Sequence, residues 1–378
     1  MNFFIKCLSS IFIGLGSTIV LAAGMADPIQ PDPALNESIV KIDIPQRFFS
    51  QTIQTTIFKP NGDGPFPIFI FNHGHNPGSL KFGHWQERER AILLTHELLN
   101  RGYVVVLPMR RGYGDSGPGT PTSFDKQQED IFPVIDYLKS VKYVDMDRIV
   151  IGGVSLGGAV SMALGTQKEK IPGLQGVINV AGGFPSDSGY SFEKQLSELS
   201  SSKNVPSLWI YGDNDYLTPP EHLDRLIKAY SIDKPNFRVA RLGVFQDSDA
   251  HYVLYRPTAV KLWMPQIDTF LSDLKLPNKV IAKSPWRMSA SSTPPESGFA
   301  PLVNSKNSII SINKQREEGY LKYLQSDYDA KAFAVSTVNG TWSYAAGVEF
   351  AADIALKRCV DRGGITCKLY AINDKVVW

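Results

Sequence analysis

The 378-residue chain has almost no excess of charge of either sign. Lysine and arginine together number 39, aspartate and glutamate 37, and the formal net charge is +2 at pH 7. Nucleic-acid-binding proteins and proteins held electrostatically at anionic membranes carry a strong basic excess, so this balance argues against both classes. The partners must be inferred from particular residues instead, and we expect no nucleic acid among them.

Cysteine is scarce, with three residues in the whole chain. Cys7 lies near the N-terminus, and only Cys359 and Cys367 remain beyond it. The stretch around this pair, "RCVDRGGITCKLY", contains no histidine, whereas a structural metal site would need two more ligands nearby. The pair is therefore predicted to form one disulfide, as is common in exported proteins.

Long hydrophobic runs are missing except at the N-terminus. There, Lys6 precedes an uncharged, mostly apolar stretch over 7–26 that ends in small residues. This layout predicts a secretory signal peptide over 1–26, cleaved between Ala22 and Ala26. The alternative is an uncleaved membrane anchor, which glycine, serine and threonine within the stretch disfavour. We expect an exported protein, periplasmic or secreted, with no stable membrane insertion after cleavage.

The composition is that of an ordinary globular protein, since 43% of all residues are hydrophobic. The runs "ESIVKIDI" and "TIQTTIFKP" are typical of antiparallel edge strands. Beyond them, strands that are apolar throughout alternate with helical segments, which predicts a parallel sheet covered on both faces. The expected fold class is α/β, doubly wound and mostly parallel. The expected strands are 66–72, 103–109, 148–153, 176–182, 207–212 and 237–243, and the helices 85–102, 126–140, 156–166, 219–230 and 257–274.

The composition changes after Leu276. Residues 277–310 are rich in serine, proline and asparagine, which is typical of a connection and not of a packed element. Residues 311–378 have the pattern strand, helix, strand and contain both remaining cysteines. We therefore predict a large domain over 27–276, a linker over 277–310 and a small α+β domain over 311–378.

A G-x-S-x-G pentapeptide, Gly153 to Gly157, lies between an expected strand and an expected helix. A serine on such a turn is held in a strained backbone conformation, and the flanking glycines leave room for it. Its hydroxyl is then exposed at the start of the helix, which predicts a nucleophile at Ser155. A closely packed turn without chemistry is the alternative. The stretch 148–160 fits neither the dinucleotide nor the P-loop spacing, and we expect no cofactor.

A serine nucleophile needs a base, and the base needs an orienting acid, in the chain order Ser, Asp or Glu, His. The loop "YGDNDYLTPPEH" supplies Asp215 after one expected strand, and His251 follows the next strand. The carboxyl ends of parallel strands are where α/β sheets build their sites. We therefore predict Asp215 as the acid and His251 as the base, with Asp213 as a turn residue. Asp247 and Asp249 are expected to be solubilising loop residues or local caps, and a contact of Asp249 with His251 in a rearranged loop is an alternative.

Acyl transfer also needs N–H donors for the oxyanion. The backbone N–H of Leu156, next to the nucleophile, is one predicted donor. The second is expected from "FNHGHNPG" (71–78), where the N–H of His75 is preferred and that of Asn76 is the alternative. A metal site on His73, His75 and His84 is a further alternative, disfavoured because no carboxylate cluster accompanies these histidines.

The motifs "FNHGH", "VVVLPMRRGYGDSGPG", "IGGVSLGG", "YGDNDYLTP" and "DAHYVL" together resemble the α/β-hydrolase superfamily, most closely its dienelactone-hydrolase and prolyl-oligopeptidase-like branch. The resemblance covers residues 35–276 and implies a triad of Ser155, Asp215 and His251. It implies that "RRGYGDSG" (110–117) borders the site without taking part in catalysis. One departure is Ala250, where relatives often have glycine.

The last 70 residues resemble a small bacterial domain of unknown function. This resemblance implies no activity. The favoured interpretation is a small domain that is held together by the disulfide and stabilises or docks the protein. The alternative is a module that binds a surface polymer or a protein.

These features lead us to expect an exported serine hydrolase, with a small or polymer-borne carboxylic ester as its substrate. A serine peptidase or amidase is the alternative within this class, weakened because the chain lacks the N-terminal propeller of the large peptidases of the branch. A catalytically idle scaffold that acts as an envelope binding protein is the alternative outside it.

Overall fold

The computed structural model describes residues 31, 33–45, 50–75, 87–119, 124–183, 192–200, 205–231, 236–246, 249–283, 294–326, 331–346 and 351–378. The predicted signal peptide, with its cleavage site and its cysteine, lies outside these residues. Within them, no helix is both long enough and apolar enough to cross a bilayer.

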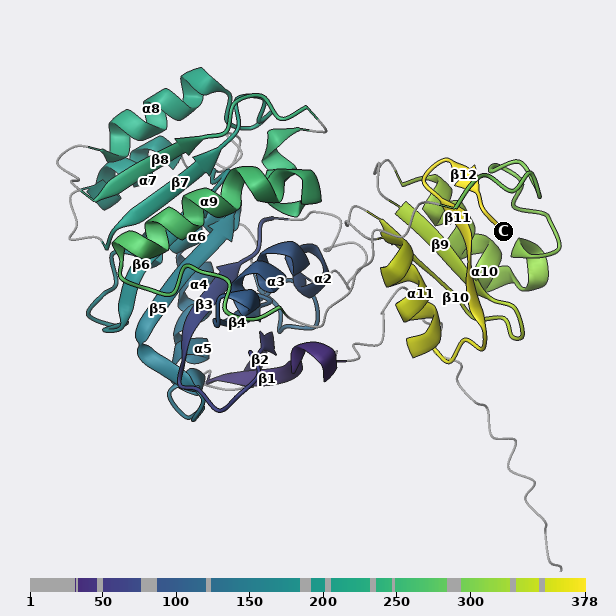
Figure 1. Ribbon diagram of the computed structural model, residues 1–378, viewed down its shortest axis with the longest axis horizontal. Coiled ribbons are helices and arrows are strands. Elements are labelled where there is room, and N and C mark those ends of the chain that lie inside the picture. Colours follow the sequence, from purple (N-terminus) through teal and green to yellow (C-terminus); the bar gives the residue numbers. More distant parts are fainter. Residues whose placement is uncertain are drawn as a thin grey trace, which may run out of the picture.

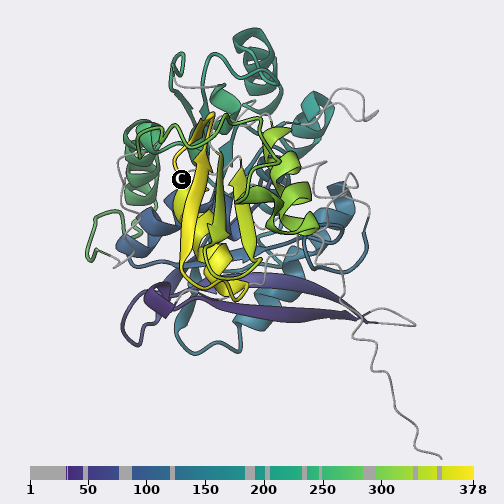
Figure 2. The same ribbon diagram turned by 90° about the vertical axis from the view of Figure 1, so that its right-hand side faces the viewer.

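An eight-stranded sheet forms the larger part of the molecule, in the order β1-β2-β4-β3-β5-β6-β7-β8 (Figure 1). β1 and β2 pair antiparallel at one edge, as predicted, and can be followed as the purple ribbon in Figure 2. β2 is antiparallel to β4, and all pairs from β4 to β8 are parallel. The strands are β1 Ser38–Pro45, β2 Ser50–Phe58, β3 Phe66–Asn72, β4 Val104–Pro108, β5 Val144–Val154, β6 Leu174–Val180, β7 Ser207–Tyr211 and β8 Phe237–Arg241.

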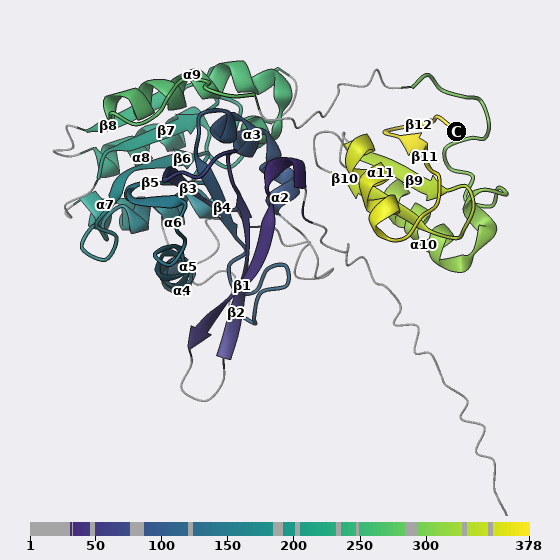
Figure 3. The ribbon, with the colours of Figure 1, turned by 60° about the horizontal axis from the view of Figure 1, so that its bottom comes forward.

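Helices cover both faces of this sheet (Figure 3). Along β4, Val105 and Leu107 face a core shared with α3 and α9, whereas Val104 and Val106 face a second core shared with α5, α6 and α8. Burial on both faces explains why these strands are apolar throughout, and the expected doubly wound fold is confirmed. The helices and 3₁₀ turns are η1 Pro33–Leu35, α2 Glu87–Arg90, α3 Ile92–Asn100, α4 Phe124–Glu129, α5 Ile131–Leu138, α6 Leu156–Leu164, α7 Phe192–Ser200, α8 Pro220–Tyr230, η3 Ala250–Tyr255 and α9 Pro257–Asp273.

Some element boundaries differ from the prediction. The expected helices 85–102 and 126–140 are each divided into two, at Ala91 and at Asp130. Asp130 is 1% exposed, and its carboxylate accepts hydrogen bonds from the backbone and the guanidinium of Arg111 in a distant loop. The spacing of apolar residues within the helix cannot predict a break at Asp130, because the contact at this break is with a residue in a distant loop.

A second, four-stranded antiparallel sheet lies in the C-terminal part, in the order β10-β9-β11-β12. Helix α10 packs Tyr320 and Tyr323 against Phe333 and Tyr370, while α11 packs Ala355 against small residues of β9 and β10. The predicted small α+β domain is thus present, but α10, β10 and β12 were not predicted. The elements are η4 Ile310–Ile312, α10 Lys314–Leu324, β9 Lys331–Ser336, β10 Trp342–Ala346, α11 Ala351–Asp361, β11 Cys367–Ile372 and β12 Lys375–Val376.

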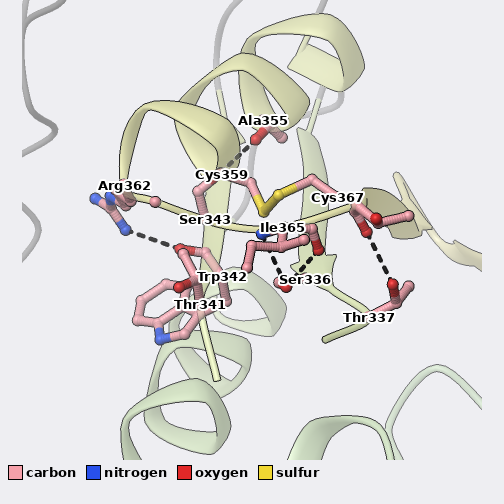
Figure 4. Close-up of a disulfide and its surroundings, with 12 residues drawn as sticks. Ser336, Thr337, Thr341, Trp342, Ser343, Ala355, Cys359, Arg362, Ile365 and Cys367 are labelled. Atoms are coloured by element: carbon pink, nitrogen blue, oxygen red, sulfur yellow. Dashed lines mark hydrogen bonds between the residues drawn. A yellow bond between two sulfur atoms is a disulfide. The ribbon is translucent and has the colours of Figure 1, made fainter. Parts of the chain in front are cut away.

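The predicted disulfide between Cys359 and Cys367 is confirmed, with a Cα–Cα distance of 6.1 Å (Figure 4). It joins the last turn of α11 to the start of β11. Cys359 is fully buried in the small-residue core beneath α11. The bond therefore fixes the helix to the strand that follows it.

The segment over 277–310 makes contacts at both of its ends. The hydroxyl of Tyr103 donates to the carbonyl of Pro277, and the N–H of Ile281 donates to the carbonyl of Asn100. The N–H of Ser297 donates to the carbonyl of Val376.

We call residues 297–326, 331–346 and 351–378 the C-terminal unit, because residues from 297 onward pack with the second sheet.

Arg316 of α10 is the central polar residue of the C-terminal unit. Its side chain is 1% exposed, and its guanidinium donates to the carbonyls of Ile309, Ser336, Asn339 and Thr341 at 2.7–3.1 Å. Ile309 immediately precedes η4, Ser336 ends β9, and Asn339 and Thr341 lie in the turn between β9 and β10. One buried cation thus supplies donors to four backbone carbonyls, of which that of Thr341 also accepts the N–H of Ser336.

We predict that Arg316→Met lowers the free energy of unfolding of the C-terminal unit by about 3 kcal/mol, because several buried carbonyls lose their donor. Hydrogen exchange of the backbone amides of the C-terminal unit, followed by mass spectrometry of its peptides, measures this loss. Lys314→Met is the matched control, since the Lys314 side chain on the same helix is 87% exposed. Equal stability of the two variants would contradict a structural role for Arg316.

Candidate active site

Ser155 occupies a sharp turn between β5 and α6. Its backbone has φ +54° and ψ −125°, a conformation that residues with side chains rarely adopt. A Cβ on Gly153 would lie 2.3 Å from the carbonyl oxygen of Gly157, and one on Gly157 would lie 2.0 Å from that of Asn72. Both flanking glycines are therefore required by space, as the G-x-S-x-G pattern predicts.

Two further glycines bring other segments against this turn. A Cβ on Gly158 would lie 2.2 Å from the side-chain oxygen of Asn179, so the lack of a side chain at Gly158 lets α6 lie close to β6. A Cβ on Gly74 would lie 3.3 Å from the Cβ of Ser155, which places the loop after β3 directly beside the serine. The segment that carries His75 thus adjoins Ser155.

Asp215 and His251 form a buried pair. The Nδ1 atom of His251 lies 3.1 Å from each carboxylate oxygen of Asp215, and the two residues are 6% and 1% exposed. Asp215 comes from the loop after β7 and His251 from η3, after β8. The carboxylate oxygen Oδ1 also accepts the N–H groups of Leu217 and Thr218, which hold it in place.

The neighbouring carboxylates have different contacts. Asp249 accepts the backbone N–H of His251 at 2.8 Å, so of the two roles expected for it, it has that of a local cap, at η3. Asp213 is half-buried, and its N–H donates to the carbonyl of Gly243 in a turn. A Cβ on Gly212 would lie 2.5 Å from the Cβ of Ala250. Gly212 therefore makes room for Ala250 at the position where relatives often have glycine.

Ser155 and the pair lie at the same edge of the sheet, because each follows the carboxyl end of a parallel strand. Among the described residues, no hydrogen bond of 3.5 Å or less joins the hydroxyl of Ser155 to His251. Catalytic hydrogen bonds are often long before substrate is bound. The arrangement brings a serine, an imidazole and a carboxylate to one edge in the predicted order.

The two predicted oxyanion donors are backbone N–H groups beside Ser155. Leu156 is the first residue of α6, so its N–H has no acceptor within the helix. In the described part of the chain, no protein acceptor takes the N–H of Leu156 or of His75. Asn76, the alternative donor, lies outside the described residues.

The side chain of His75 is fixed by a residue that we did not predict. Its Nδ1 atom lies 2.7 Å from the hydroxyl of Tyr113, which comes from the loop "RRGYGDSG" after β4. Burial raises the pKa of Tyr113 to about 12, and burial, with the nearby charge of Arg110, lowers the pKa of His75. Both side chains are therefore neutral at pH 7.

His73 has a purely structural set of contacts. Its Nδ1 atom donates to the carbonyl of Gly74 at 2.8 Å, while Nε2 accepts the backbone N–H of Arg110 at 3.1 Å. Burial, and next the charge of Arg110, place the pKa of His73 well below its ordinary value. With both ring nitrogens engaged, His73 is not available as a metal ligand. His84 lies outside the described residues, within which no group of three histidine, cysteine or acidic residues could hold a metal.

Buried contacts hold the loop "RRGYGDSG" beside the site. The fully buried guanidinium of Arg110 donates to the carbonyl of His73 and, at 2.8 Å, to the side-chain oxygen of Gln127. Arg111 binds Asp130, as described above. This loop borders the site, as the family resemblance implies, and it also supplies Tyr113.

Two tyrosines beside His251 were also not predicted. The ring centroids of Tyr216 and Tyr252 lie 5.3 and 5.6 Å from that of the imidazole, and both rings stand edge-on to it. Their positions next to Asp215 and His251 in the sequence are the only signal that could have indicated them.

Comparison with known proteins gives a family match over residues 51–221, to the X-Pro dipeptidyl-peptidase (S15) family. This range contains Ser155 and Asp215 and ends before His251. Among solved structures, an esterase of Pyrococcus furiosus is 16% identical, with a TM-score of 0.50, over 66% of this chain and 96% of its own.

Two other solved structures are similar. One is described as a dienelactone hydrolase of Klebsiella pneumoniae, with 18% identity and a TM-score of 0.44 over 62% of this chain and 98% of its own. The other is a thermostable esterase of Pseudomonas putida, with 16% identity and a TM-score of 0.47 over 66% and 86%. At these identities the structural likeness concerns the fold alone. The sheet topology and this structural likeness together show that the chain has the α/β-hydrolase fold, and residues 51–221 match the X-Pro dipeptidyl-peptidase (S15) family.

Proposed function

We propose that this protein is an exported serine hydrolase that cleaves carboxylic esters through an acyl-enzyme on Ser155. The observation that carries the proposal is the strained Ser155, raised at the edge of the sheet where the buried Asp215–His251 pair also lies. Strain of this kind at a solvent-facing serine is typical of a nucleophile. The hydrolase names of the matched family and of the similar structures support the same class.

In the first half of the reaction, Nε2 of His251 takes the proton of the Ser155 hydroxyl while the oxygen attacks the ester carbonyl. The negative charge that develops on the carbonyl oxygen is stabilised by the N–H groups of Leu156 and His75. The tetrahedral intermediate then collapses. The bond to the alcohol breaks, and the imidazolium returns its proton to the leaving oxygen.

In the second half, water attacks the acyl-enzyme and gives its proton to His251. The same two N–H groups stabilise the second oxyanion, the acid product leaves, and the proton returns to Ser155. Asp215 holds Nδ1 of the imidazole as a donor, so that Nε2 is free to act as the base. The bonds from Leu217 and Thr218 keep the carboxylate in that position.

We predict that a fluorophosphonate probe labels the mature protein and that Ser155→Ala abolishes both labelling and ester hydrolysis, with a loss of at least about 10⁴-fold. Labelling is read by intact mass, and hydrolysis with p-nitrophenyl acetate. Ser272→Ala is the control serine variant, because Ser272 is exposed on α9. It should retain labelling. An unlabelled wild-type protein would favour the idle envelope scaffold.

A peptidase is the second candidate, favoured by the match to the X-Pro dipeptidyl-peptidase family. We expect ester cleavage to dominate because an amine leaving group depends more on protonation, a contribution of about 10²-fold or more in general-acid catalysis. Rates with p-nitrophenyl acetate and with Gly-Pro-p-nitroanilide, each divided by the uncatalysed rate, make the comparison. A larger rate enhancement for the anilide would identify a peptidase.

Export is the last part of the proposal, supported by the N-terminal pattern and by the disulfide. Expression with the native N-terminus in a bacterium that has two membranes should give a periplasmic or secreted protein that lacks the first 22 to 26 residues. Intact mass and N-terminal sequencing measure this. A full-length protein in the membrane fraction would indicate the uncleaved anchor instead.

A further inference from the structure

Tyr216 and Tyr252 form an aromatic pair beside the imidazole of His251. Their own ring centroids lie 6.4 Å apart, and their planes differ by 24°. Each ring is edge-on to the imidazole, at interplanar angles of 71° and 88°. The two tyrosines therefore present nearly parallel faces next to the group that must protonate the leaving alcohol.

Several hydrogen bonds make the backbone beneath the pair rigid. The N–H of Tyr216 donates to a carboxylate oxygen of Asp249, and the N–H of Tyr252 donates to the Asp249 carbonyl at 3.1 Å. Tyr216 also directly follows Asp215, whose carboxylate is fixed by two further N–H groups. The rings thus belong to the same rigid turns as the acid and the base.

Tyr216 is 59% exposed, whereas Asp215 and His251 below it are almost fully buried. A large aromatic ring that remains exposed contributes little to the core and presents its surface to solvent. A ring at the solvent side of a reactive imidazole can contact whatever group the imidazole protonates.

We propose that Tyr216 and Tyr252 form a binding platform for a planar, aromatic alcohol part of the ester substrate. The proposal rests on the proposed esterase function. During acylation, the leaving oxygen must come within hydrogen-bond distance of Nε2 of His251. The carbon skeleton attached to that oxygen therefore extends past the nearest side chains, which include these two rings. Aromatic rings favour stacked or edge-on contact with another planar ring over contact with a puckered one.

The charges around the pair favour a neutral alcohol. Burial raises the pKa of Tyr216, as do, in decreasing order, the neighbouring Tyr252 and the carboxylates of Asp215 and Asp249. These negative charges repel an anionic leaving group. A neutral aryl or benzylic alcohol fits both the aromatic surface and the local charge.

Benzyl acetate and cyclohexylmethyl acetate test the platform, because they yield the same acetyl-enzyme and differ in the planarity of the alcohol. We expect the wild-type protein to prefer the benzyl ester in kcat/KM by about fivefold. Tyr216→Leu and Tyr252→Leu should each move this ratio toward one. Tyr216→Phe, which keeps the ring, should retain it.

Phe299→Leu is the matched control, since this ring is 44% exposed in the C-terminal unit. It should have the wild-type ratio. A wild-type ratio near one, or a ratio that both leucine variants preserve, would overturn the platform. Loss of the preference in Tyr216→Phe would also overturn it, because the hydroxyl and not the ring would then be responsible.

Failure of the esterase function is recognised separately, as absence of both fluorophosphonate labelling and hydrolysis of any ester. In that case, the platform is tested by titration with benzyl alcohol, followed through the tyrosine ring signals in NMR. Saturable binding that is lost in Tyr216→Leu and absent with cyclohexylmethanol supports it. No binding of benzyl alcohol by the wild-type protein overturns it.

Discussion

The close approach of three backbone segments around Ser155 is the constraint on which the rest of the site depends. The end of β3, the end of β5 and the first turn of α6 lie so near one another that Gly153 and Gly157 have no room for a Cβ. This contact fixes where the helix begins, and it therefore fixes the N–H of Leu156. It also places the loop after β3 beside the serine, and with it the N–H of His75.

Buried polar contacts beneath the turn maintain this approach. The side-chain amide of Asn72 donates to the hydroxyl of Ser161, which links the end of β3 to α6. The amide of Asn179 donates to the hydroxyl of Tyr211, which in turn donates to the carbonyl of Gly182. Each bond joins elements that are distant in the sequence. The strained backbone of Ser155 is thus supported by hydrogen bonds between residues outside the turn itself.

Structural features that depend on a few neighbouring residues could be predicted from the sequence. A glycine two residues from a serine and a wholly apolar strand can each be recognised in a short stretch. The chain order of Ser155, Asp215 and His251 can be recognised because each residue follows a strand that the sequence predicts. Tyr113, Tyr216 and Tyr252 could not be recognised in this way. Their positions near the histidines result from loops that meet only after the sheet has formed. The same reason applies to Arg316, whose four acceptors come from the residue before η4, from the end of β9 and from the turn beyond it.

The two histidines of "HGH" show how burial and partners decide what one residue type does. His73 points into the protein, where Arg110 binds its imidazole and its carbonyl, and burial keeps the ring neutral. His75, two residues later, is only half-buried, and the hydroxyl of Tyr113 holds it at Nδ1. The first histidine anchors the loop to the strand beyond it. The second is thereby held next to Ser155, and its backbone N–H is left for the oxyanion.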